Sequence, residues 1–128
     1  MTSITSDTYR VHFNSTCYEH LNTYLKAHRF SMLFIIVDTN THECCLPKFM
    51  SHLETKVPIE IIEIEAGEHH KTIDTCVGVW NALSDLGADR KSLILNLGGG
   101  VVTDLGGFVA CTFKRGIKYI NVPTSLLA

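Results

Sequence analysis

The sequence predicts an α/β fold, namely a three-layer, Rossmann-like domain with a mainly parallel sheet. Two apolar runs of strand length, residues 32–37 (MLFIIV) and 92–97 (SLILNL), show no alternation with charged residues. Such runs are typical of strands that helices cover on both faces of a parallel sheet. Segments of helical periodicity separate them, and this alternation predicts βαβ units. The 128 residues are enough for one domain, 1–128, with its own core.

The first half of the chain supplies two more strands and two helices. Residues 9–13 predict an edge strand, and residues 17–27 carry a helical apolar stripe. Residues 41–53 predict a second helix, whose start Pro47 should displace toward later positions. In residues 59–64 Ile and Glu alternate at first, so this strand should lie near an edge of the sheet.

The second half contains two helices and the last strand. Thr72 is the expected N-cap of a helix that stops at Gly87. Residues 101–113 predict another helix, and residues 118–122 a strand that Pro123 closes. The inner stripe of the helix after Thr72 consists of Cys76, Val79, Trp80 and Leu83.

Composition excludes several classes of protein. The net charge is −2 and Lys and Arg form no cluster, so no nucleic-acid partner is expected. No apolar run reaches the roughly 18 residues of a membrane span, and the first ten residues, MTSITSDTYR, do not resemble a secretion signal. We therefore expect a cytoplasmic protein with no membrane partner.

The cysteines predict reduced thiols rather than disulfides, because there are five of them and none forms C-x-x-C. His42, Cys44 and Cys45 are close in sequence, but adjacent cysteines are poorly placed to converge on one tetrahedral zinc ion. No metal site is therefore expected within this chain.

Four loops follow the predicted strands at their carboxyl ends: residues 38–40, 66–71, 98–100 and 123–125. Ligands of open α/β sheets bind beyond the carboxyl ends of the strands. These four loops are therefore expected to form one continuous rim that carries the binding site.

The glycine loop 98–100 is not the dinucleotide fingerprint G-x-G-x-x-G, because Thr103 occupies the third glycine position. Three glycines before a helix can bind a phosphate, but they can also serve only as a sharp turn. Asp104 is expected in the first turn of that helix, where it could simply favour the helix dipole. Gly106 and Gly107 are unfavourable inside a helix, so a backbone or a ligand should pack very close to them.

The polar residues of the other loops each permit two interpretations. Asp38 suits ribose hydroxyls, with Asn40 beside it, but it could equally be a turn residue that ends a strand. Lys71 could lie near a pyrophosphate or simply be solvated. His69 and His70 are expected to face solvent rather than bind metal.

Three segments, AGEHHK, GADRKSLILNLGGGVVTDLGGFVACTFKRGI and INVPTSLLA, strongly resemble the N-terminal cofactor domain of the 3-dehydroquinate synthase family. The resemblance extends from about Asp38 to Ala128 and is densest after Gly67. One departure is Thr103, where the family commonly has glycine, and it is expected to narrow the pocket slightly.

The resemblance implies an NAD site and one contact to an anionic substrate, Arg115. The resemblance implies that Asp38 and Asn40 hold the adenosine ribose and that Glu68 and Lys71 also line the cofactor. Backbone N–H groups of Gly99, Gly100 and Val101 would bind the pyrophosphate, and Asp104 would lie near the nicotinamide half. The wall of the site would be completed by Thr124, Ser125 and Leu127.

The reaction implied is that of a carbon–oxygen lyase of the shikimate pathway, which makes aromatic amino acids. It converts 3-deoxy-D-arabino-heptulosonate 7-phosphate to 3-dehydroquinate and phosphate, with NAD and a divalent metal, zinc or cobalt. The family's metal ligands and its C-terminal helical domain would come after Ala128. The chain is therefore expected to be a truncated domain without catalytic residues, inactive alone, and part of a homodimer as the full-length enzyme.

Three alternatives stay open. One is another sugar-phosphate cyclase of the deoxy-inosose or valiolone synthase type. A more distant one is a polyol dehydrogenase of the glycerol dehydrogenase type, against which the R-G and V-P-T-S-L-L-A segments argue. The third is a nucleotide-binding module that performs no chemistry.

Overall fold

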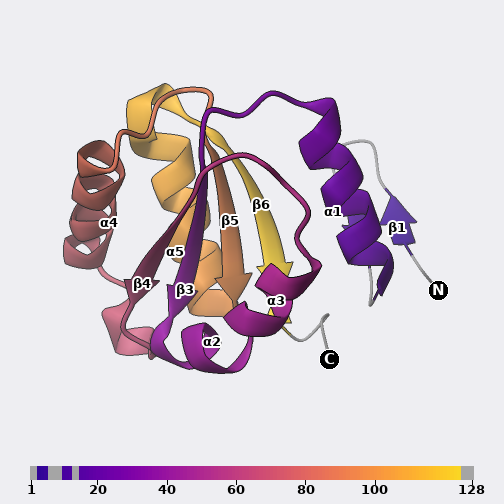
Figure 1. Cartoon of the computed structure of the whole chain (residues 1–128). Helices are drawn as coiled ribbons and strands as arrows, with labels where there is room; N and C mark the ends of the chain where they lie inside the picture. Colours follow the sequence, from indigo (N-terminus) through magenta and orange to yellow (C-terminus); the bar gives the residue numbers. More distant parts are fainter. Residues whose placement is uncertain (1–2, 6–9, 13–14, 125–128) are drawn as a thin grey trace.

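A four-stranded sheet forms the centre of the molecule, and every neighbouring pair of its strands is parallel. The computed structural model describes residues 3–5, 10–12 and 15–124. The strand order is β4-β3-β5-β6, with helices on both faces (Figure 1). The strands are β3 (Leu33–Asp38), β4 (Ile59–Ile64), β5 (Leu93–Gly98) and β6 (Lys118–Pro123). The predicted three-layer, parallel α/β fold is confirmed, as is the edge position of β4.

Two apolar clusters, one on each face of the sheet, hold the three layers together. One lies beneath α4 (Ile73–Asp85) and α5 (Gly100–Thr112). The other lies beneath α1 (Ser15–Ala27) and α3 (Leu46–His52). Alternate side chains of β3 and β5 enter opposite clusters, so both strands are buried on both faces. This double burial explains why neither strand alternates with charged residues.

The ends of α4 lie where the sequence predicts them. The side chain of Thr72 accepts a hydrogen bond from the backbone N–H of Thr75. After the helix, Gly87 adopts a φ of +85°, which favours glycine. Trp80 is only partly buried, and its Nε1 donates to Oγ1 of Thr112 over 3.1 Å, which ties α4 to α5.

The predicted helix over residues 41–53 is instead two helices, α2 (Thr39–Cys44) and α3. The expectation that Pro47 displaces the start was wrong for α2, because Asp38 caps that helix directly after β3. Pro47 lies in the first turn of α3, where its missing N–H costs nothing.

The predicted strand at residues 9–13 corresponds to β2 (Arg10–His12), while residues 9 and 13 lie outside the described part. It pairs antiparallel with β1 (Ser3–Thr5) in a separate two-stranded sheet, not at an edge of the main one. Among the residues described, no helix has the length and apolar character needed to cross a bilayer.

The close approach expected at Gly106 and Gly107 exists at the first glycine, but the neighbour is a side chain. A β-carbon on Gly106 would overlap the carboxamide of Asn96, whereas one on Gly107 would lie 3.5 Å from Tyr119, an ordinary contact. Asn96 is fully buried in β5, and its Nδ2 donates to Oδ1 of Asn121 in β6 over 3.0 Å. Its own Oδ1 has no hydrogen-bond partner among the described residues.

Candidate functional site

The carboxyl ends of the four parallel strands meet along one edge of the sheet, at the bottom of Figure 1. The chain passes from β3 to β4 on one side and from β5 to β6 on the other, so the strand order reverses between β3 and β5. Such a reversal creates the crevice in which doubly wound sheets bind ligands. Asp38 and Gly98 end the two strands that border it. We call this edge, formed by residues 38–40, 66–71, 98–100 and 123–124, the rim.

The glycine loop leaves the N-terminus of α5 uncapped and open. Gly99 is the N-cap of α5, and no side chain caps the helix. The first amides of a helix have no acceptor within it, so those of Gly100 and Val101 are available to a ligand. A β-carbon on Gly99 or Gly100 would meet nothing within 4 Å, and both residues are exposed. The loop therefore presents donors and free space where an anion would bind.

Asp104 lies in the second turn of α5, not in the first as the sequence suggested. Its Oδ2 is 2.9 Å from Nζ of Lys71, which Glu68 approaches at 3.6 Å. A hydrogen bond to Asp104 and the charge of that carboxylate raise the pKa of Lys71. Lys71 is exposed, but it is held beside the start of α5. The pair joins the loop after β4 to the helix after β5.

Thr103 folds back on its own helix. Its hydroxyl donates to the carbonyl oxygens of Gly99 and Gly100, both over 3.2 Å. The side chain therefore stays against the first turn of α5 and satisfies its hydroxyl there. The expectation that Thr103 narrows a cofactor pocket stays a prediction.

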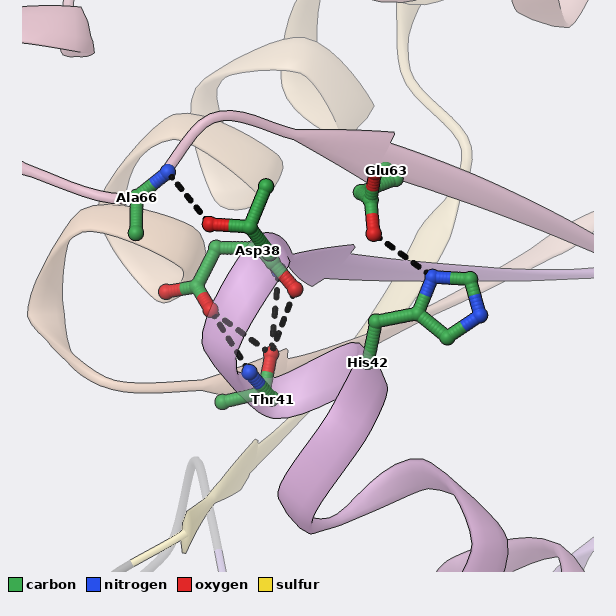
Figure 2. A network of polar contacts seen from close by, with 6 residues as sticks. Asp38, Thr41, His42, Glu63 and Ala66 are labelled. Carbon is green, nitrogen blue, oxygen red and sulfur yellow. Dashed lines mark hydrogen bonds and ion pairs between the residues drawn. The ribbon is translucent and has the colours of Figure 1, made fainter.

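Asp38 performs the turn role that the sequence left open and still offers an acceptor. Figure 2 shows a capping box in which Oδ1 of Asp38 accepts from the backbone N–H of Thr41 over 2.8 Å. The Thr41 hydroxyl in turn accepts from the backbone N–H of Asp38 over 2.9 Å. The second carboxylate oxygen, Oδ2, bonds to none of the described residues. Asn40 is exposed in the first turn of α2, which Asp38 caps, so a ribose could reach both side chains.

Two contacts that the sequence did not reveal tie the loops of the rim together. Oγ1 of Thr39 accepts from the backbone N–H of Ala66 over 3.3 Å, and Nδ1 of His42 lies 2.7 Å from Oε1 of Glu63 (Figure 2). Both contacts depend on β3 and β4 being neighbours in register. No pattern in the sequence predicts either contact. In this region the sequence offered only the spacing of Asp38 and Thr41, which is typical of a helix N-cap.

Arg115 is not brought to the rim. It belongs to the short 3₁₀ turn η2 (Phe113–Arg115), which follows the far end of α5. The 13 residues of α5 span about 20 Å, so Arg115 lies at the opposite, amino-terminal edge of the sheet. Lys114 and Arg115 both adopt positive φ, +47° and +67°. No ion-pair partner of Arg115 is found among the described residues.

The remaining predicted residues divide into placed and unplaced ones. Thr124 is half-buried at the end of β6 on the rim, whereas Ser125 and Leu127 lie outside the described residues. His69 is exposed, as expected, but His70 is half-buried, and its Nε2 lies 3.0 Å from Glu65.

Within the described part of the chain, no group of three or more His, Cys, Asp or Glu side chains could hold a metal ion. Cys44, Cys45, Cys76 and Cys111 are free thiols. Burial raises the pKa of Cys45 and Cys76, so neither thiol is activated as a nucleophile.

Comparison with known proteins identifies relatives of the chain. Residues 61–128 match the family described as 3-dehydroquinate synthase N-terminal. The chain is 44% identical over 108 residues to 3-dehydroquinate synthase of Parabacteroides distasonis, which covers 84% of this chain and 30% of that protein. It is 43% identical over 104 residues to 3-dehydroquinate synthase of Thermococcus kodakarensis, covering 81% of this chain and 29% of that protein. The chain thus spans about a third or less of these relatives.

Solved structures share the fold. A 2-deoxy-scyllo-inosose synthase complexed with carbaglucose-6-phosphate, NAD+ and Co2+ superposes with a TM-score of 0.81 at 24% identity. The match covers 96% of this chain and 35% of that one. The 2-epi-5-epi-valiolone synthase of Streptomyces hygroscopicus, with NAD+ and Zn2+ bound, gives 0.69 at 24% identity, with 97% and 34% covered.

Proposed function

The chain belongs to the 3-dehydroquinate synthase family, and on that premise we propose that residues 1–128 form the NAD-binding domain of a 3-dehydroquinate synthase. The whole enzyme would convert 3-deoxy-D-arabino-heptulosonate 7-phosphate to 3-dehydroquinate and phosphate in the cytoplasm. The observation that carries the proposal is the uncapped start of α5 with the Lys71–Asp104 pair beside it, at the point where the strand order reverses. Two relatives more than 40% identical carry the name of this enzyme.

The residues of the rim fit a dinucleotide. The amides of Gly99, Gly100 and Val101 would donate to the pyrophosphate, which the positive end of α5 also favours. Oδ2 of Asp38 and the side chain of Asn40 would hold the adenosine ribose. Of the wall residues, only Thr124 lies in the described part, on the rim beside the glycine loop, while Ser125 and Leu127 stay predicted contacts.

Lys71, Asp104 and Glu68 would line the cofactor between the pyrophosphate and the nicotinamide half. Lys71 would supply positive charge beside the phosphates, and its pairing with Asp104 fixes where that charge lies. Bound NAD would supply a group that accepts a hydride from the substrate and returns it. The part of the chemistry that belongs to this domain is therefore to bind and orient the cofactor.

The described residues do not fit the divalent metal, zinc or cobalt, that the family uses, because no suitable cluster of ligands exists among them. No step through a metal is therefore assigned to this domain. Catalysis would require the segments that the longer relatives possess, and the isolated chain should release no phosphate from substrate.

Arg115 remains the proposed contact to the anionic substrate, but its place at the amino-terminal edge excludes contact with the rim of its own chain. In the expected homodimer, Arg115 of one copy would complete the site of the other. Arg115 is exposed, and its guanidinium pairs with none of the described residues, which leaves it available to a second copy.

Titration of the chain with NAD, followed by calorimetry, tests the proposal. Half of a cleft should bind weakly, with a dissociation constant on the order of 1 mM, about −4 kcal/mol. Asp104→Ala should weaken that binding, and Cys111→Ser, an exposed change on the distal end of α5, should not. Equal binding by Asp104→Ala would remove Asp104 from the site, and no binding by the chain would remove the site itself.

A cyclase of the deoxy-inosose or valiolone synthase type is the second candidate, because the sheet and helices superpose on those enzymes. Both candidates would bind NAD through this domain, so only the substrate would separate them. Assaying the full-length protein with both substrate classes, the seven-carbon sugar acid phosphate and a hexose phosphate, distinguishes them. NAD binding without turnover of either would favour a module that performs no chemistry.

A further inference from the structure

A groove of about 520 Å³ runs along the outer side of β4, away from the glycine loop. β4 is an edge strand whose only partner among the described strands is β3. On its outer side, the backbone N–H and C=O groups therefore face no other described strand. Such an edge is a template for an added strand from another polypeptide.

The floor of the groove is apolar and consists of buried side chains. Ile62, Ile64 and Val79 line it, and their side chains are only 7%, 6% and 3% exposed. Ile62 and Ile64 come from the edge strand itself, and Val79 comes from the facing side of α4. Alternate side chains of an added strand would therefore rest on an existing apolar surface.

The helical wall of the groove consists of small residues, Thr75, Gly78 and Ala82. Gly78 lies in the middle of α4, where glycine costs about 1 kcal/mol relative to alanine. Unlike Gly106, it has no neighbour that requires it, because a β-carbon there would meet nothing within 4 Å. Close passage of an extended backbone over α4 would account for the glycine.

The negative charge of the groove favours a basic occupant. Residues 59–68, IEIIEIEAGE, contain four glutamates and no lysine or arginine. Glu63 and Glu65 line the groove, and both are substantially exposed despite their contacts to His42 and His70. A second copy added antiparallel through β4 would bring the glutamates of the two strands together, which is unfavourable. Pairing of β4 with β6 of a second copy would leave one sheet edge free on each outer copy. Further copies could then add without limit and build a fibre.

We propose that the groove between β4 and α4 binds an extended segment of a partner protein, with Lys or Arg at alternate positions, that pairs with β4 as a fifth strand. Alternate apolar side chains of the segment would contact Ile62, Ile64 and Val79. The basic side chains would approach Glu63 and Glu65. This surface borders the proposed NAD site, because His70 lines the groove and also belongs to the rim.

The test uses a fluorescent peptide of alternating lysine and valine, KVKVKVK, and its glutamate counterpart, EVEVEVE. The basic peptide should bind saturably and slow hydrogen exchange of the outward-facing amides of β4. Gly78→Leu should fill the groove, since a β-carbon there meets nothing within 4 Å, and should weaken binding by at least about tenfold. The matched control, Val77→Leu, changes an exposed position on α4 that does not line the groove, and it should bind like the parent.

Thermal unfolding of Gly78→Leu should show stability equal to or above that of the parent, which separates lost docking from lost folding. Failure of the basic peptide to bind, equal binding by Gly78→Leu, or equal binding of the acidic peptide overturns the proposal. Protection of β4 that rises with chain concentration alone also overturns it, because the occupant would then be a second copy.

Discussion

Gly106 in α5 and Asn96 in β5 fit one another so closely that a β-carbon on the glycine would occupy the space of the carboxamide. Asn96 is fully buried, and its Nδ2 donates to Oδ1 of Asn121 on the adjacent strand. The glycine therefore allows α5 to lie against the part of β5 that directly precedes the glycine loop.

Gly106→Ala should destabilise the fold by about 2–3 kcal/mol, because the added carbon forces Asn96 away from Asn121. Urea unfolding measures the loss. Gly107→Ala is the matched control, since its β-carbon makes only an ordinary contact with Tyr119; it should be neutral or stabilise by up to about 1 kcal/mol.

The double variant Asn96→Ala/Gly106→Ala should recover part of what the single variants lose, with a coupling of at least about 1 kcal/mol. The alanine at position 106 would then fill space that the shorter side chain at 96 vacates. Purely additive losses in the double variant would show that the two residues do not interact.

Asp38 has two separable roles. Thr41→Val removes the reciprocal bond of the capping box and should cost about 1 kcal/mol in stability, while it leaves NAD binding nearly unchanged. Asp38→Asn can still cap α2 but loses the carboxylate that would bind the ribose, so NAD affinity should fall about tenfold with little loss of stability. Calorimetric titration and thermal unfolding of both variants measure the two effects. Parallel losses of affinity and stability in both would show that capping alone matters.

The pair of Lys71 and Asp104 predicts a loss of stability in alkali. Asp104 raises the pKa of Lys71 in the folded state above its unfolded value. The stabilising contribution is therefore complete below the ordinary lysine pKa of about 10.4 and is lost as pH rises through the folded value. Asp104→Asn should lower the Lys71 pKa in an NMR titration. An unchanged pKa in that variant would mean that the ion pair does not persist in solution.

Asp89 predicts the opposite dependence at the amino-terminal edge. A hydrogen bond from Ser31 over 2.6 Å, helped by the backbone N–H of Lys91, lowers the pKa of the Asp89 carboxyl. Its contribution to stability is present above the ordinary value of about 3.9 and is lost as pH falls through the folded value. Unfolding of the parent and of Asp89→Asn should converge in acid, and a constant difference down to low pH would contradict this.

The sequence was sufficient for the two central strands, β3 and β5, because residues buried on both faces show uninterrupted apolar runs. It was insufficient between residues 39 and 52, where Pro47 suggested a late helix start and the cap by Asp38 determined an early one. The rim followed from parallel strands sharing an edge. The contacts within it did not, because the Thr39–Ala66 and Lys71–Asp104 contacts join loops 27 and 33 residues apart.

The placement of Arg115 could not be read from the sequence either. The resemblance to a family implies that Arg115 contacts a substrate. It does not tell whether that substrate site belongs to the same chain or to the other copy in a dimer. Only the direction of α5, from the rim to the far edge, reveals that Arg115 and the glycine loop lie at opposite ends.

The position of η2 at the far edge is part of a wider separation of charge. Of the 11 lysines and arginines in the chain, those on segments at the amino-terminal edge are Lys26, Arg29, Lys56, Arg90, Lys91, Lys114, Arg115 and Lys118. The carboxyl edge carries mostly acidic residues, Asp38, Glu63, Glu65, Glu68 and Asp104, with Lys71 among them, whereas the amino-terminal edge adds fewer acids, Glu54, Asp85 and Asp89, to its basic residues. Despite its small net charge, the domain is thus an electric dipole directed along its strands. On a negatively charged chip or resin it will adsorb through the amino-terminal edge, with the rim facing the flowing solution.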